Sequence, residues 1–204
     1  MRPSYNFALL LALENYKNER DASVKQKICR FILFKLLGWR MVGTPPSELK
    51  YIFVAIPHTS NWDFVYGWLA IQALDLDVKI FAKDVFFTWP LNYVCAFFGV
   101  LPVNRRKRTN FVDTIAEKLD KTDKLRLLIT PEGARSFQPT LKSGYYHLAL
   151  KANVPIVLAG PNFRDKTFTI MPPRMPLPTF AEDQAQVIEF CKTQNARHPE
   201  SSFQ

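Results

Sequence analysis

The sequence predicts a single α/β domain in which a mostly parallel central sheet is flanked by helices. Short, apolar, β-rich runs alternate with helical patterns along most of the chain. The chain has 204 residues, about the length of one domain, and is 48% hydrophobic, so it can bury a substantial core. This composition excludes disorder, collagen-like structure and coiled coil as descriptions of the whole chain.

Strands are expected where apolar runs end at a turn residue. Residues 51–56 read Tyr-Ile-Phe-Val-Ala-Ile and stop at Pro57, which is typical of a buried strand. The expected strands are residues 51–56, 78–82, 125–130, 154–159 and 168–171. The expected helices are residues 62–74, 110–119, 144–152 and a last one to about Lys192, which Thr179 and Glu182 open with a capping box. Residues 172–178 contain four prolines and must be extended.

Residues 1–45 are expected to form an N-terminal helical membrane-contact segment, with the α/β domain in residues 46–204. Residues 28–39 are apolar nearly all round a helical wheel, with Arg30 and Lys35 as their charges. Twelve residues are too few to span a bilayer, which needs about 20. A core helix with snorkelling basic side chains is one interpretation. A helix lying in a membrane interface is the other, favoured by the flanking residues Lys25, Lys27, Trp39 and Arg40.

A second apolar stretch, residues 85–104, carries no charge and is interrupted by Pro90, Asn92 and Pro102. It is more consistent with a wall for an acyl chain, or with a membrane-facing surface, than with a transmembrane helix.

The net charge of +9 indicates anionic partners. Residues 105–108 read Arg-Arg-Lys-Arg, but no nucleic-acid-binding motif accompanies them, and we expect no nucleic acid. Three cysteines, Cys29, Cys95 and Cys191, lie far apart and favour a reducing compartment over a disulfide framework or zinc site. The apolar run 7–13 is short and lacks a cleavage pattern, so no signal peptide is expected.

His58 is the histidine best placed for chemistry. It follows a predicted strand, and Asp63 lies five residues on, across a turn into a helix. This carboxylate can accept the Nδ1 proton of His58, which leaves Nε2 free to take a proton from a hydroxyl. Asp63 also completes a capping box with Ser60, and the two roles are compatible. His147 is expected to be packed in a helix, and His198 to be solvated in the polar tail.

A second group of residues, 131–136, follows the predicted strand 125–130 and reads Pro-Glu-Gly-Ala-Arg-Ser. Glycine lets the backbone approach a ligand closely, and the guanidinium of Arg135 matches phosphate oxygens. A tight turn with a solvent-facing arginine is the alternative.

With these motifs the sequence resembles the PlsC-like glycerolipid acyltransferases, the 1-acylglycerol-3-phosphate acyltransferase family. Residues 57–63 match its His-x-x-x-x-Asp block, residues 131–136 its Pro-Glu-Gly-Thr-Arg-Ser block and residues 154–157 its Val-Pro-Ile-Val block. The remaining block looks like Lys83, Asp84, Pro90, Gly99 and Arg105, and Lys142-x-Gly144 also fits. Ala134 stands where the family has threonine, which removes a hydroxyl near the expected phosphate site.

The resemblance implies a glycerol-3-phosphate acyltransferase-like fold and the residues that act in it. His58 and Asp63 would be catalytic, with no metal and no cofactor besides acyl-CoA or acyl-carrier protein as co-substrate. The acceptor and its phosphate would be bound by Glu132, Gly133, Arg135, Arg105 and Lys142. The acyl chain or donor would lie near Lys83, Pro90 and Gly99.

The function implied is transfer of a fatty acyl group to the free hydroxyl of a lysophospholipid, by default 1-acylglycerol-3-phosphate, in phospholipid biosynthesis. The enzyme would work at an anionic membrane surface, on the cytoplasmic face, as a peripheral or monotopic protein. Another lyso-lipid acceptor, or a non-catalytic lipid-binding protein associated with a membrane, stays open as an alternative. Acyl length, donor type and oligomeric state are also left open.

Overall fold

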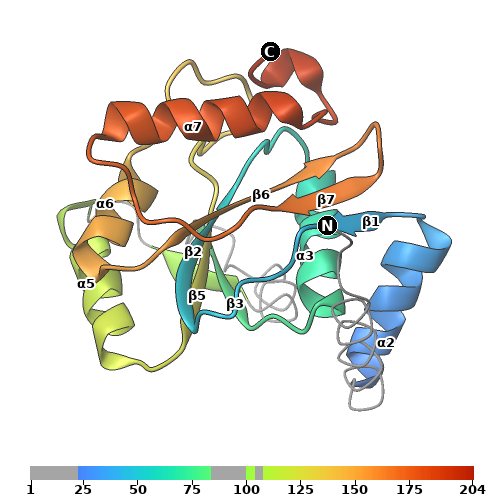
Figure 1. Cartoon of the computed structure of the whole chain (residues 1–204), viewed down its shortest axis with the longest axis horizontal. Helices are drawn as coiled ribbons and strands as arrows, with labels where there is room; N and C mark the ends of the chain where they lie inside the picture. Colours follow the sequence, from blue (N-terminus) through green and yellow to red (C-terminus); the bar gives the residue numbers. More distant parts are fainter. Residues whose placement is uncertain (1–22, 84–99, 104–107) are drawn as a thin grey trace, which may run out of the picture.

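The computed structural model describes residues 23–83, 100–103 and 108–204. Its centre is a seven-stranded sheet with the strand order β1-β7-β6-β2-β5-β3-β4 (Figure 1). The strands are β1 Arg40–Val42, β2 Lys50–Ala55, β3 Val78–Lys83, β4 Val100–Val103, β5 Leu125–Ile129, β6 Ile156–Asn162 and β7 Thr167–Ile170. The five strands from β6 to β4 are parallel, whereas β7 is antiparallel to β6 and carries β1 parallel to itself. The mostly parallel α/β sheet is therefore confirmed.

Helices cover both faces of this sheet. The helical elements are α2 Val24–Arg30, the π-helix η1 Phe31–Leu36, α3 Asn61–Ala73, α5 Arg108–Lys121, α6 Gly144–Ala152, α7 Phe180–Thr193 and the 3₁₀-helix η3 Pro199–Ser201. Buried side chains of α5, α6 and α7 form one core cluster with the sheet, and α3 packs on the opposite face. An outer layer, α2 and η1, packs against α3 at the edge of the molecule (Figure 1).

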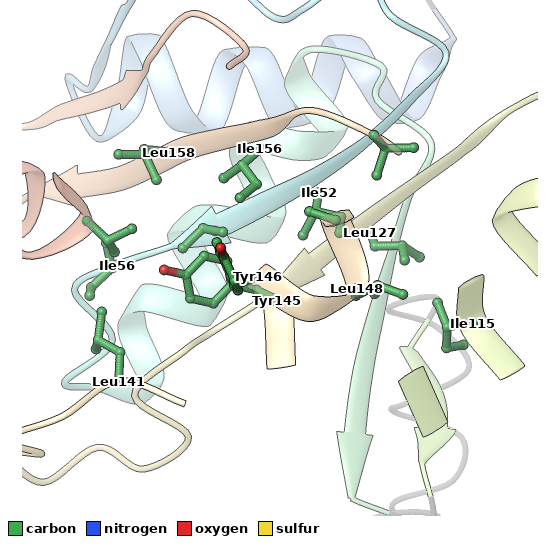
Figure 2. Close-up of a cluster of buried hydrophobic side chains, with 14 of the residues drawn as sticks. Ile52, Ile56, Ile115, Leu127, Leu141, Tyr145, Tyr146, Leu148, Ile156 and Leu158 are labelled. Atoms are coloured by element: carbon green, nitrogen blue, oxygen red, sulfur yellow. The ribbon is translucent and has the colours of Figure 1, made fainter. Parts of the chain in front are cut away.

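The central strand β2 is apolar throughout because both of its faces are buried. Ile52 and Val54 point into the cluster with α5, α6 and α7, while Tyr51 and Phe53 point toward α3. Figure 2 shows the first cluster, where Ile52 lies among side chains of the neighbouring strand β6 and of helix α6. Each fully buried aliphatic side chain of this kind stabilises the fold by about 1.5–3 kcal/mol.

All five predicted strands and all four predicted helices are present, most of them within two residues of their predicted ends. The exception is β6, which continues through Gly160 and Pro161 to Asn162, although a Gly-Pro pair is typical of a turn. Pairing with β7 overrides that local signal. Position 160 also needs glycine, because a Cβ there would clash with the carbonyl oxygen of Ile56, the residue after β2.

The N-terminal part of the described chain combines features of both interpretations. Cys29, Leu33 and Trp39 are buried against α3, as a core helix requires. Large apolar side chains nevertheless remain exposed on the outer side of α2 and η1: Val24, Ile28, Phe31 and Leu36. The boundary at residue 45 stays a prediction, although β1, which precedes it, belongs to the same sheet as β2. Among the described helices, none has the length and apolar character needed to cross a membrane.

Candidate active site

The loop that carries His58 connects β2 to the start of α3. Ser60 is the N-cap of α3, and its hydroxyl accepts a hydrogen bond from the backbone N–H of Trp62 at 3.2 Å. Oδ2 of Asp63 accepts the backbone N–H groups of Thr59 and Ser60 at 2.6 and 2.7 Å. The capping box predicted from Ser60 and Asp63 is therefore confirmed, and it fixes the carboxylate at the helix N-terminus.

The same carboxylate oxygen faces the imidazole of His58. Nδ1 of His58 lies 3.6 Å from Oδ2 of Asp63, and the Asp63 side chain is almost entirely buried. This distance is longer than a hydrogen bond, so the contact is electrostatic, and a movement of a few tenths of an ångström would convert it into a bond. Oδ1 of Asp63 is buried and has no hydrogen-bond partner among the described residues.

Burial keeps the imidazole neutral. Burial, together with the smaller effect of the nearby positive charge of Arg135, lowers the pKa of His58 from 6.5 to about 4. Burial raises the pKa of Asp63, an effect opposed by the two backbone N–H groups that it accepts. A neutral imidazole whose Nδ1 faces a carboxylate has Nε2 available as a proton acceptor.

Glu132 joins the second motif to the first. It lies just beyond the end of β5, which pairs with β2 in register, so the loops following both strands lie side by side. Oε2 of Glu132 accepts the backbone N–H of His58 at 2.7 Å, and the residue is only 3% exposed. Burial raises the pKa of this carboxyl from 4.5 to about 7, with a smaller contribution from the charge of Asp63. The Glu132 carboxyl thus contacts the loop that carries His58, and its predicted contact with the acceptor stays a prediction.

The other residues of the second motif surround the same loop. Gly133 has a φ of +65°, and a Cβ at this position would clash with the side chain of Lys142. The Lys142 ammonium group therefore lies directly over the Gly133 backbone, as their shared assignment to one site requires. Arg135 is exposed and lies near enough to His58 and Asp63 to act on the pKa values of both.

Of the predicted site residues, the structure brings six together at the carboxyl ends of β2 and β5: His58, Asp63, Glu132, Gly133, Arg135 and Lys142. Lys83 is the last residue of β3, a strand parallel to β5. Pro90, Gly99 and Arg105 lie outside the described residues. No group of three or more His, Cys, Asp or Glu side chains in the described part of the chain is arranged to hold a metal ion.

Of the other two histidines, His198 has an exposed side chain as expected, whereas His147 departs from expectation. His147 is exposed on α6, with only its ring edge against Tyr146, so the prediction that it is packed is wrong. It falls on the outward side of α6, between the buried residues Tyr146 and Leu148. The side chain of His198 is half-exposed, but its backbone N–H donates to Oγ1 of Thr59 at 3.2 Å. No pattern in the polar tail signals this contact.

Three comparisons relate the chain to known proteins. The sequence model of the family described as Acyltransferase matches residues 43–159, more than half of the chain. The 1-acyl-sn-glycerol-3-phosphate acyltransferase alpha of Mus musculus is 25% identical over 118 residues, which cover 55% of this chain and 40% of that protein. The crystal structure of the 1-acyl-sn-glycerophosphate (LPA) acyltransferase PlsC from Thermotoga maritima superposes with a TM-score of 0.58 at 20% identity, covering 82% of this chain and 77% of that one.

Proposed function

Because this chain belongs to the acyltransferase family, we propose that it moves a fatty acyl group from acyl-CoA or acyl-carrier protein to the free hydroxyl of a lysophospholipid. The observation that carries the proposal is the partly buried, neutral His58 beside Asp63 at the carboxyl end of the sheet. The acceptor that we favour is 1-acylglycerol-3-phosphate, the substrate in the names of the mouse and bacterial relatives.

In the reaction we propose, Nε2 of His58 takes the proton from the acceptor hydroxyl as its oxygen attacks the thioester carbonyl. The C–S bond breaks, and the imidazolium returns its proton to the departing thiolate, so that an ester and a thiol are formed. Asp63 orients the imidazole through Nδ1 and stabilises its transient positive charge. No covalent acyl-enzyme is needed.

The positive charges beside His58 suit a phosphate on the acceptor. Arg135 can present a planar fork to phosphate oxygens, and Lys142 supplies a second charge over the Gly133 backbone. Because Gly133 has no Cβ, the Lys142 side chain can approach the backbone closely there. Arg105 would add a further charge from the neighbouring motif.

An apolar pocket between α3 and the sheet is suited to part of the acyl chain. Ala55, three residues before His58, lines this pocket together with Gly67 on α3. The other lining residues include Phe53, Ala70, Ile71, Phe168 and Ile170. This pocket complements the apolar stretch 85–104, which we expect to guide the chain as well.

We also propose peripheral association with an anionic membrane surface through α2 and η1. Their exposed apolar residues Val24, Ile28, Phe31 and Leu36 have no apolar cover among the described residues. Lys27 and Lys35 lie on the same short segment and would meet anionic head groups. The same proposal places the protein on the cytoplasmic face of the membrane and gives it a role in phospholipid biosynthesis.

The test is an acyltransfer screen of the detergent-purified protein with several lysophospholipids and both donor types. His58→Ala should lower kcat by about 10²- to 10⁴-fold, the usual effect of losing a general base. His147→Ala is the matched control, because this histidine is exposed on α6 away from the site, and it should retain full activity. Near-normal transfer by His58→Ala would refute the mechanism, and binding of lipid without any transfer would favour the non-catalytic alternative.

Arg135→Ala separates the acceptor from the donor. It should raise the KM of a phosphate-bearing acceptor and leave the KM of the thioester unchanged. Arg164→Ala, an exposed arginine in the turn after β6, is the control for loss of one surface charge. A raised donor KM with an unchanged acceptor KM would reverse the assignment.

A further inference from the structure

The chain after α7 folds back over the carboxyl end of the sheet. This C-terminal segment, residues 195–204, lies beside the end of α7 in Figure 1 and follows residues 43–159, the part that the family model matches. The backbone oxygen of Asn195 accepts the N–H of Phe163 at 2.9 Å, which anchors the start of the segment to the end of β6. Because the C-terminal segment lies outside the residues that the family model matches, the family resemblance assigns this segment no role.

The C-terminal segment contacts the loop between His58 and Asp63 directly. The backbone N–H of His198 donates to Oγ1 of Thr59 at 3.2 Å, and Thr59 is 6% exposed. The backbone N–H of the same Thr59 donates to Oδ2 of Asp63, the oxygen that faces the imidazole of His58. One residue thus links the C-terminal segment to the catalytic carboxylate.

A second contact fixes the segment beside the helix that the loop opens. The guanidinium of Arg197 lies over the ring of Trp62, with its centre 5.6 Å from the ring centroid. It lies over the ring of Phe163 at 5.7 Å as well. A guanidinium held by two aromatic rings is restrained in orientation.

The end of the segment reaches the other motif loop. The ring of Phe203 packs against Phe137, one residue after the Pro-Glu-Gly-Ala-Arg-Ser motif, with centroids 5.4 Å apart. The Ser202 hydroxyl lies 3.4 Å from the thiol of Cys191, which ties this end to α7. The segment therefore contacts both loops that carry the predicted site residues.

We propose that the C-terminal segment positions the catalytic loop, and that Thr59 is the positioning residue through which it acts. This inference rests on the acyl-transfer function proposed above. The contact between His58 and Asp63 is 3.6 Å long and becomes a hydrogen bond only after a small movement, so its formation is sensitive to where the Thr59 backbone is held. The hydrogen bond from His198 restrains Thr59 through its side chain, and the Glu132 carboxyl restrains the backbone of the neighbouring His58.

Thr59→Val tests the proposal, because valine matches threonine in shape and lacks the oxygen that His198 bonds. We expect kcat to fall about 3- to 10-fold, corresponding to the loss of one hydrogen bond, with the KM of acceptor and donor unchanged. Thr59→Ser keeps the hydroxyl and should recover most of the lost kcat. A change confined to KM, or an equal loss in the serine variant, would overturn the positioning role.

Hydrogen exchange followed by mass spectrometry provides a readout that needs no activity. In Thr59→Val, amides of residues 195–204 and of residues 57–63 should both exchange about 3- to 10-fold faster. If only residues 195–204 exchange faster, the segment packs on the loop without holding it, and the inference fails. A wild-type protein that transfers no acyl group would refute the proposed function while leaving this exchange result to decide the structural link.

Phe203→Leu serves as a second variant should Thr59→Val fold poorly. It keeps an apolar side chain in the core and removes the ring contact with Phe137. Faster exchange in residues 131–138 together with a lower kcat would support the proposal. Unchanged kcat in a folded variant with a loosened C-terminal segment would overturn it.

Discussion

Glu132→Gln isolates the effect of a buried carboxyl that links the two motif loops. Glu132 is 3% exposed, and Oε2 accepts the backbone N–H of His58 at 2.7 Å. Because burial raises its pKa to about 7, the native protein keeps a proton on this group at pH values where the unfolded chain has already lost it. Folding stability should therefore fall as the pH rises from about 4.5 to 7, a window set by the ordinary pKa of 4.5 and the raised one.

The size of the loss in folding free energy follows from how far the pKa of Glu132 is raised. An increase of the pKa from 4.5 to about 7 corresponds to a loss of about 3 kcal/mol of folding free energy once the pH exceeds 7, taking about 1.4 kcal/mol per tenfold change in proton affinity. Glutamine keeps an oxygen that can accept the His58 N–H and does not ionise. The variant should match the wild type near pH 4.5 and be more stable by up to about 3 kcal/mol at pH 8.

Urea unfolding followed by tryptophan fluorescence at pH 4.5, 6, 7 and 8 measures both proteins under the same conditions. Glu189→Gln is the control, since the Glu189 side chain is 75% exposed on α7 and should leave the pH dependence unchanged. A Glu132→Gln protein that is less stable than the wild type at pH 8 would refute the reasoning. That result would mean that the ionised carboxylate stabilises the loop more than its burial costs.

Three further predictions concern the same site and its support. The kcat/KM of acyl transfer should keep its value down to about pH 5 and fall with a midpoint near 4, where His58 gains its proton, and a midpoint near 6.5 in a pH profile would contradict this. Gly133→Ala should lower the unfolding free energy in urea by about 1–2 kcal/mol, because alanine is strained at positive φ and its Cβ must displace Lys142. Asp183→Ala should lower the unfolding free energy by about 3 kcal/mol in the same assay, because this fully buried carboxylate accepts hydrogen bonds from the Tyr145 hydroxyl and from Arg174. A loss below about 1 kcal/mol would contradict this reasoning.

The central strands could be predicted because burial on both faces makes them continuous apolar runs. β2, β5 and the start of β6 carry this pattern, and a proline or a change to polar residues marks where each predicted run ends. β1 and β4 were not predicted, since they have three and four residues and lie at the two edges of the sheet. In strands this short the sequence pattern is weak: it was recognised in β7, which also has four residues, but not in these two edge strands.

The candidate site was predictable as far as local sequence determines it. A strand followed by a helix N-terminus explains the spacing of His58 and Asp63, and the position of Glu132 after another parallel strand places it at the same edge of the sheet. The direction of the Glu132 carboxylate and the contact of His198 with Thr59 are set by tertiary packing across 74 and 139 residues of sequence. No local pattern records contacts over such separations.

The capping box and the catalytic pair are consequences of one arrangement. Oδ2 of Asp63 accepts the N–H groups of Thr59 and Ser60, and it can do so only from the third position of the helix. The two amides hold the carboxylate against the turn. His58 directly precedes these two residues, and its Nδ1 therefore lies 3.6 Å from the same Oδ2. A carboxylate held in this way cannot swing to follow the imidazole. Its distance from His58 must therefore be adjusted by the loop, which is why the proposed mechanism depends on the restraints that Glu132 and the C-terminal segment place on that loop.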